Sequence, residues 1–208
     1  LQQVLDSLRE TSSNETELGT AFESLSKVFF ENDSTQNQQY SQVWHYEDWA
    51  KDKPGYSSTD IGIDLVGKLA EGSGYAAIQC KFYEPDHSIS KADLDSFISA
   101  SATSDFDRLV LIDTSTQSIG KNAQSVFDNL DKEYLRIQQT ELEESRINWL
   151  TYLNENRVHL NPKKELRDHQ IQAVRAVTEG LEEEDRGKMI MACGTGKTFT
   201  SLRIAETI

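Results

Sequence analysis

Three polar side chains of the kinds that support phosphodiester hydrolysis are spaced so that a single hairpin would gather them. Residues 75–83 alternate apolar and polar positions, which places Gln79 and Lys81 on one face of a strand, about 7 Å apart. Asp64 lies in the preceding strand-like segment 61–69, and the glycine-containing stretch between the two segments favours a hairpin. Antiparallel pairing would bring Asp64 opposite Gln79 and Lys81. A carboxylate, an amide and an ammonium group are therefore predicted to converge on one patch.

These residue types suit a metal-dependent nuclease. Cleavage of a phosphodiester needs a hard cation such as Mg²⁺ or Mn²⁺ held by oxygen atoms, a positioned water molecule and a group that offsets the charge of the transition state. Asp64 would give the metal an anionic oxygen, and Gln79 and the backbone carbonyl of Cys80 would give neutral ones. Lys81 would position the water and stabilise the charge. Glu23, on an expected amphipathic helix, is a further candidate, although a solvated helix face explains it equally well.

Such a pattern also arises by chance on an ordinary hairpin, so the elements around it matter. Apolar periodicity, turns and caps predict the paired strands 61–69 and 75–83, a buried strand at 109–112, and helices at 14–30, from Ser90 through Ile98, and at 122–130. Residues 32–41 are expected to form a loop, 43–49 a short strand or an irregular segment, and 131–153 helical structure. This order indicates an α/β fold with a mixed sheet flanked by helices.

A second motif near the end of the chain is typical of a nucleotide-binding loop. A strand expected at 188–192 leads into Gly194-Thr195-Gly196-Lys197-Thr198, and a helix follows. Backbone N–H groups of residues 193–197 would surround the β-phosphate of ATP, Lys197 would reach the β and γ oxygens, and Thr198 would bind Mg²⁺.

Composition limits the remaining function classes. The net charge is −14, and residues 1–140 contain 23 acidic against 11 basic residues, so this part should bind DNA weakly by itself. No apolar run is long enough to span a membrane, and no secretory signal is present, which favours the cytoplasm. The two cysteines, Cys80 and Cys193, are expected to be reduced thiols rather than a disulfide or a zinc site.

Several segments resemble one nuclease family. Gly62-Ile63-Asp64, residues 77–83 and the helix residues 19–23 resemble the Mrr-like branch of the PD-(D/E)xK nucleases, in which Gln commonly replaces the middle acid. The resemblance covers roughly residues 15–130 and implies metal-dependent cleavage of double-stranded DNA. Two departures matter: no proline precedes Asp64, and the neutral Gln79 should weaken metal binding relative to a second carboxylate.

The nucleotide-binding loop resembles the first motif of superfamily 2 helicases, in which Met191 can stand for the usual first glycine. Leu166-Arg167-Asp168-His169-Gln170 resembles the segment of those motors whose glutamine, here Gln170, recognises adenine. We therefore expect a nuclease domain at 1–140, a helical linker at 141–165 and an incomplete RecA-like domain at 166–208. Because the remaining motor motifs do not occur within these residues, this chain should not hydrolyse ATP.

A nuclease ahead of such a motor resembles the single-chain type I-like (type ISP) restriction-modification enzymes of prokaryotes. That resemblance implies that the rest of the motor, an adenine methyltransferase and a target-recognition domain follow in the same polypeptide and deliver DNA to the acidic nuclease. Two alternatives remain open. One is a catalytically silent nuclease fold that binds DNA or a partner, and the other is a helicase-nuclease of another defence or repair system.

Overall fold

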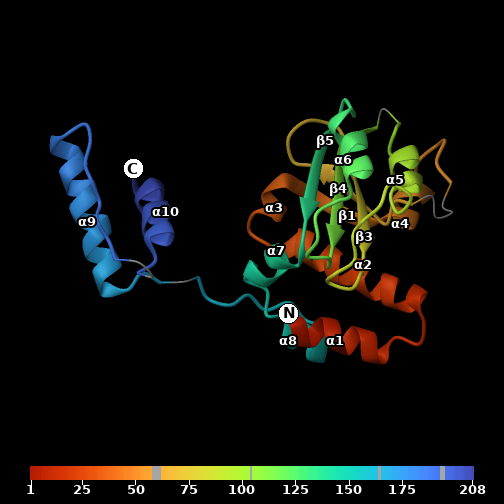
Figure 1. Ribbon diagram of the computed structural model, residues 1–208, viewed down its shortest axis with the longest axis horizontal. Coiled ribbons are helices and arrows are strands. Elements are labelled where there is room, and N and C mark those ends of the chain that lie inside the picture. The colour runs from red at the N-terminus through yellow and green to blue at the C-terminus, as the bar shows by residue number, and fades with distance from the viewer. Residues whose placement is uncertain (58–61, 104, 164, 193–194) are drawn as a thin grey trace. The chain divides into compact units, whose positions relative to one another are not determined.

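A computed structural model describes residues 1–57, 62–103, 105–163, 165–192 and 195–208. The chain divides into two compact units, Leu1–Asn161 and Pro162–Ile208 (Figure 1), and each is described by itself.

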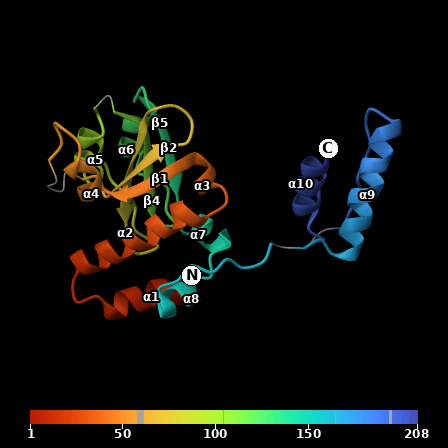
Figure 2. The same ribbon diagram turned by 180° about the vertical axis from the view of Figure 1, so that it is seen from behind.

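The first unit is built on a five-stranded mixed sheet of order β1-β2-β3-β4-β5 (Figures 1 and 2). The strands are β1 (Tyr40–His45), β2 (Leu65–Leu69), β3 (Tyr75–Lys81), β4 (Phe106–Asp113) and β5 (Glu133–Ile137). β1, β2 and β3 pair antiparallel, whereas β3, β4 and β5 pair parallel. The predicted hairpin and the predicted fold class are both confirmed.

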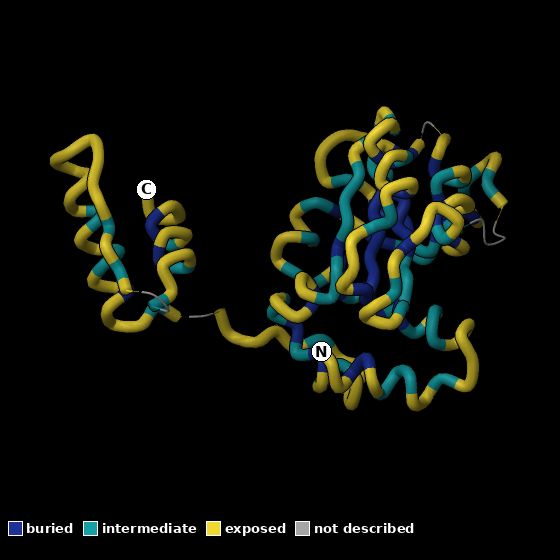
Figure 3. The backbone as a smooth tube through the Cα atoms, in the orientation of Figure 1, coloured by how far each residue is buried: buried dark blue, intermediate teal, exposed yellow. Residues whose placement is uncertain are grey.

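Helices cover both faces of this sheet. They are α1 (Gln2–Thr11), α2 (Glu15–Asn32), α3 (Gln36–Gln39), α4 (Tyr46–Lys51), α5 (Asp95–Ala100), α6 (Lys121–Asp128), α7 (Gln139–Glu144) and α8 (Trp149–Glu155). Alternate side chains of β3 enter two cores: Ile78 belongs to the core that α1, α2, α7 and α8 share with the sheet, and Ala77 belongs to the core that α4, α5 and α6 share with it. Figure 3 shows the buried strands between exposed outer surfaces. The polar residues of β3 are therefore held on a rigid central strand.

Helix α2 illustrates how local sequence sets an element. The Asn14 side chain accepts a 2.9 Å hydrogen bond from the backbone N–H of Glu17, which caps the first turn. Phe22, Leu25 and Phe29 follow at helical spacing and are buried against the sheet. This arrangement leaves Glu23 at the edge of the buried stripe.

The structure differs from the prediction at both edges of the sheet. Residues 131–153 were expected to be helical, but Glu133–Ile137 form β5, paired in parallel with β4. Strand β1 begins at Tyr40, inside the segment expected to be a loop. Local patterns in such short edge segments are weak, and pairing with a preformed neighbour overrides them. Residues 141–161, assigned above to a linker, contribute Leu142, Ile147 and Trp149 to the buried core of the first unit.

The second unit contains α9 (Asp168–Glu183) and α10 (Lys197–Thr207), which contact each other. The strand expected at 188–192 is not formed, because the described residues of this unit offer no second strand with which it could pair. Among the described residues, no helix has the length and apolar character needed to cross a membrane.

Candidate active site

A cavity of about 1260 Å³ lies beside the ends of β1 and β3. Its walls come from α2, from the end of β1 and the start of α4, from the segment before β2, and from β3 with the loop that follows it. Asp64, Lys81, Cys80 and Glu23 all line it. Four residues chosen for their chemistry therefore lie around one opening.

Asp64 is held by backbone contacts to β3 and to the first residue of α4. Its backbone N–H donates to the carbonyl of Ile78 (3.0 Å), and its carbonyl accepts from the N–H of Tyr46 (2.9 Å). Its carboxylate accepts a 2.6 Å hydrogen bond from the backbone N–H of Cys80. Since Leu65 pairs with Ile78, Asp64 stands opposite Gln79, as the hairpin register predicts.

A glycine allows the segment before Asp64 to approach α5. Gly62 has a φ of +91°, and a Cβ atom at this position would lie 2.9 Å from the backbone nitrogen of Phe97. A larger residue would push the segment away from the helix. Gly62 therefore helps to set the position of Asp64.

Gln79 is buried and is not among the residues that line the cavity. Its side chain is 2% exposed, and Oε1 has no hydrogen-bond partner among the described residues. A buried carbonyl oxygen without a partner is costly, and an ion or a water molecule commonly explains one. Gln79 thus carries an oxygen that a metal could satisfy.

Cys80 has two separate roles in the geometry. Its thiol packs with the α2 side of the sheet, where burial, followed by the charge of Asp64, raises its pKa well above the ordinary value. The neutral thiol is therefore a poor metal ligand. In a strand, the N–H and C=O of one residue point the same way, so the Cys80 carbonyl is directed toward the side on which Asp64 lies.

Lys81 ends β3, next to Asp113 in the parallel register. Its backbone carbonyl accepts from the N–H of Thr114 (3.2 Å), which fixes the point where its side chain leaves the strand. Glu23 reaches the same cavity from α2.

Several residues that line the cavity lie outside the predicted site. His45, Glu47 and Asp48 were treated as loop residues, but they line the cavity because β1 ends beside Asp64. Tyr83 and His87, after β3, also line it, and neither carries a sequence signal that marks it. Among the described lining residues, seven carboxylates face one lysine and two histidines; the carboxylates belong to Glu15, Glu23, Glu47, Asp48, Asp64, Glu84 and Asp86.

This donor set fits a hard divalent cation better than a soft one. No three His, Cys, Asp or Glu side chains come close enough to form a metal site within the described part of the chain. A cation here would instead need the Asp64 carboxylate, the partnerless Gln79 Oε1 and a backbone carbonyl, which are all oxygen donors. The surplus of carboxylates attracts cations and repels DNA phosphates.

Thr195, Gly196, Lys197 and Thr198, four of the residues predicted to bind ATP, lie at the start of α10. Gly196 has a φ of +79° and precedes the helix, and Lys197 Nζ donates to the carbonyls of Met191 (3.3 Å) and Ala192 (3.4 Å). Thr198 is exposed in the first turn of α10. Gly194, and with it Cys193, lies outside the described residues.

Gln170 connects α9 with this loop. The residue is 5% exposed, its Nε2 donates to the carbonyl of Thr195 (3.0 Å), and its Oε1 accepts from the backbone N–H of Arg167 (2.9 Å). The predicted adenine-recognition residue is thus bonded to the loop predicted to bind phosphate.

Comparisons with known proteins point in the same direction. A family model of the Mrr type, described as "Restriction endonuclease", matches residues 31–159, and one described as "Type III restriction enzyme, res subunit" matches residues 163–208. No curated protein matches the chain. The solved structure of "ATP-dependent Type ISP restriction-modification enzyme LlaBIII bound to DNA" is 31% identical with a TM-score of 0.75, and the match covers 98% of this chain but 13% of that one.

Two further structures are more distant. "DNA modification-dependent restriction endonuclease AspBHI" is 13% identical with a TM-score of 0.43, covering 68% of this chain and 33% of that one. "MspJI Restriction Endonuclease in Complex with 27-mer Oligonucleotide" is 18% identical with a TM-score of 0.40, covering 67% of this chain and 29% of that one.

Proposed function

Because this chain belongs to the Mrr-type restriction endonuclease family, we propose that its first unit hydrolyses DNA phosphodiester bonds with Mg²⁺ or Mn²⁺. The observation that supports this most is the grouping of Asp64, the partnerless oxygen of Gln79 and Lys81 at the end of one hairpin. Each side chain comes from rigid strand-linked backbone, as a catalytic site requires.

The side chains have distinct roles in this proposal. Asp64, Gln79 Oε1 and the Cys80 carbonyl would hold the cation, which when bound polarises the scissile phosphate and lowers the pKa of a water molecule. Lys81 would orient that water and offset the negative charge that develops on the phosphate oxygens. Glu23, which lines the cavity from α2, would accept a hydrogen bond from the water.

We further propose that the second unit begins a motor that binds ATP through Gln170, Gly194, Thr195, Gly196, Lys197 and Thr198. The matches to a res subunit and to a type ISP enzyme support a larger, ATP-dependent restriction-modification enzyme that acts on double-stranded DNA in a prokaryotic cytoplasm. The remaining motor, methyltransferase and target-recognition domains would deliver DNA. Delivery by other domains would offset the weak DNA affinity expected of the acidic cavity.

Plasmid nicking tests the nuclease directly. The chain at high concentration should nick supercoiled plasmid with Mg²⁺ or Mn²⁺, and Asp64→Ala and Lys81→Ala should each abolish nicking while the chain stays folded. Asp128→Ala and Lys121→Ala, on α6 and outside the cavity lining, serve as matched controls. Efficient cleavage at low enzyme concentration in about 150 mM salt would contradict the dependence on delivery.

The same acidity favours one alternative, a nuclease fold that no longer cuts and only binds a partner. Mn²⁺ titration calorimetry separates the two functions. A nuclease should bind Mn²⁺ at a site that Asp64→Ala removes, whereas a silent module should bind none there.

A further inference from the structure

The loop after β3 is held by a regular series of hydrogen bonds from the segment after β4. We define residues 81–89 as the wall segment and residues 113–120 as the supporting segment. The backbone carbonyls of alternate wall residues, 81, 83, 85, 87 and 89, all accept hydrogen bonds from the supporting segment. The segments that follow β3 and β4 therefore stay side by side past the ends of both strands, held by backbone and side-chain hydrogen bonds.

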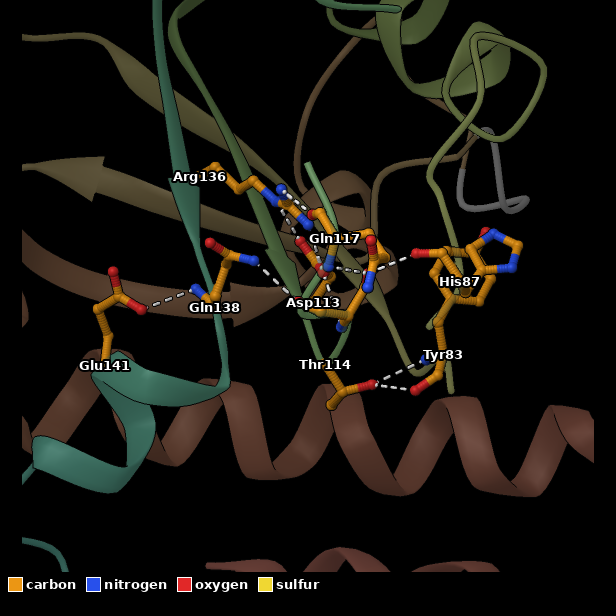
Figure 4. Close-up of polar contacts among 9 residues, drawn as sticks. Tyr83, His87, Asp113, Thr114, Gln117, Arg136, Gln138 and Glu141 are labelled. Carbon is orange, nitrogen blue, oxygen red and sulfur yellow. Dashed lines mark hydrogen bonds and ion pairs between the residues drawn. The ribbon is translucent and has the colours of Figure 1, made fainter. Parts of the chain in front are cut away.

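Thr114 makes the central contacts of this series. Its Oγ1 accepts from the backbone N–H of Tyr83 (2.8 Å) and donates to the carbonyl of the same residue (2.6 Å), as Figure 4 shows. Its own N–H donates to the carbonyl of Lys81 (3.2 Å). One side chain thus replaces both backbone bonds that a neighbouring strand would provide.

Thr116 repeats the contact one step further along the wall segment. Its N–H (2.9 Å) and its Oγ1 (2.7 Å) both donate to the carbonyl of Pro85. Thr116 is exposed, unlike Thr114, which is 2% exposed. One buried and one exposed threonine therefore both hold the wall segment by hydrogen bonds.

The supporting segment is itself anchored to β5. Asp113 is fully buried, and its carboxylate accepts from Arg136 Nε (2.7 Å), Arg136 Nη2 (2.9 Å) and the N–H of Ser115 (2.9 Å). Arg136 Nη1 also donates to the carbonyl of Gln117, and Gln138 Nε2 donates to that of Ser115 (both 2.8 Å; Figure 4). Bidentate, charge-assisted hydrogen bonds of this kind fix the orientation of the two side chains relative to each other.

The wall segment presents its side chains to the cavity. Lys81, Tyr83 and His87 all line it, and the rings of Tyr83 and His87 stack with centroids 3.9 Å apart. His87 Nε2 lies 3.6 Å from Asp93 Oδ2. These aligned groups depend on a loop that has no regular secondary structure of its own.

We propose that Thr114, Asp113 and Arg136 are positioning residues of the active site, which hold Lys81 and the Tyr83–His87 pair in the cavity. This inference rests on the proposed nuclease function. In this proposal β5 supports residues 113–117, and these residues support the wall segment. The wall segment in turn places the side chains that would face the scissile phosphate of DNA.

Thr114→Val tests this chain of contacts, because valine keeps the shape of threonine and removes the hydroxyl. Thr114→Ser restores the hydroxyl, and Thr103→Val, which removes a hydroxyl bonded to Tyr56 at the other end of β4, is the matched control. In the 208-residue chain, hydrogen exchange of the backbone amides of residues 82–84, 86 and 87 is measured together with Mn²⁺-dependent plasmid nicking; Pro85 has no amide hydrogen.

We expect Thr114→Val to speed exchange of these amides about tenfold and to lower kcat for nicking about tenfold, with unchanged KM for plasmid and unchanged Mn²⁺ affinity. Thr114→Ser should restore both values, and Thr103→Val should match the wild type. If Thr114→Val does not fold, Thr116→Val at the exposed position should speed exchange of residues 86–87 instead.

Unchanged exchange in a folded Thr114→Val or Thr116→Val chain would overturn the proposal, as would faster exchange with undiminished nicking. A wild-type chain that never nicks would refute the proposed function. The exchange result would then still decide whether Thr114 holds the wall segment.

Discussion

The carboxylate of Asp64 and the backbone N–H of Cys80 form a 2.6 Å hydrogen bond at the point where the β2–β3 ladder ends. The bond fixes the orientation of a candidate metal ligand without using another side chain. This bond needs an acceptor oxygen but not a negative charge. Asp64→Asn therefore tests the charge of the side chain while it keeps the hydrogen bond.

Asn at position 64 keeps an acceptor oxygen for Cys80 but loses the negative charge. We expect the free energy of unfolding to change by less than about 1 kcal/mol, while Mn²⁺ affinity falls at least about tenfold. Urea unfolding and titration calorimetry measure the two effects. Asp128 on α6 likewise accepts a hydrogen bond, from Gln124, and serves as the control. Asp128→Asn should leave Mn²⁺ binding unchanged. Equal Mn²⁺ affinity in both variants would remove Asp64 from the metal site.

Gln79→Glu should raise Mn²⁺ affinity, because a carboxylate replaces a neutral oxygen at a position that is 2% exposed. The expected gain is about tenfold, which corresponds to about 1.4 kcal/mol of binding free energy. Without metal the same variant should be less stable, since a buried carboxyl group lacks a cationic partner. Gln79→Leu should weaken Mn²⁺ binding. Affinity that does not respond to either change would show that Oε1 is not a ligand.

Arg136→Gln should destabilise the first unit strongly, because Asp113 would remain buried without a cation. Breaking a buried pair in this way costs about 3–5 kcal/mol, measured by urea unfolding. Adding Asp113→Asn should recover part of the loss. Lys51→Gln breaks an ion pair whose side chains are 61% and 60% exposed, and should have no measurable effect. A small loss in Arg136→Gln would show that the pair is not a structural anchor.

Tyr83 should make the protein sensitive to alkaline pH. Burial, and then the charge of Asp93, raises the pKa of Tyr83 from 10.0 to about 12. The unfolded chain loses this proton near pH 10, whereas the folded chain keeps it to about pH 12. The stabilisation is therefore complete below pH 10 and is lost as the pH rises through 12. Tyr83→Phe should lose less stability than the wild type between pH 9 and about 11.5 in urea titrations. Parallel losses would contradict the raised pKa.

Lys197→Ala should weaken ATP binding by the second unit at least about tenfold, because the ammonium group is the main cation near the start of α10. A fluorescent ATP analogue measures this. Lys188→Ala, before the loop, is the matched control and should bind like the wild type. Equal affinities would place the nucleotide elsewhere.

The sequence by itself determined the features that depend on neighbours along the chain. Alternation in residues 75–83 and a short turn set the register that places Asp64 opposite Gln79, since a one-residue slip would move every side chain of the strand to the opposite face of the sheet. The Asn14 cap and the spacing of Phe22 and Phe29 likewise determine α2.

Only the tertiary structure decided which distant segments close the cavity. The loop after β3 is ordered by Thr114, 31 residues from its partner Tyr83. The buried pair of Asp113 with Arg136 exists because residues 133–137 join the sheet as β5 rather than forming a helix. Short edge strands gain their stability from pairing and burial against a formed core, and neither can be read from their own few residues.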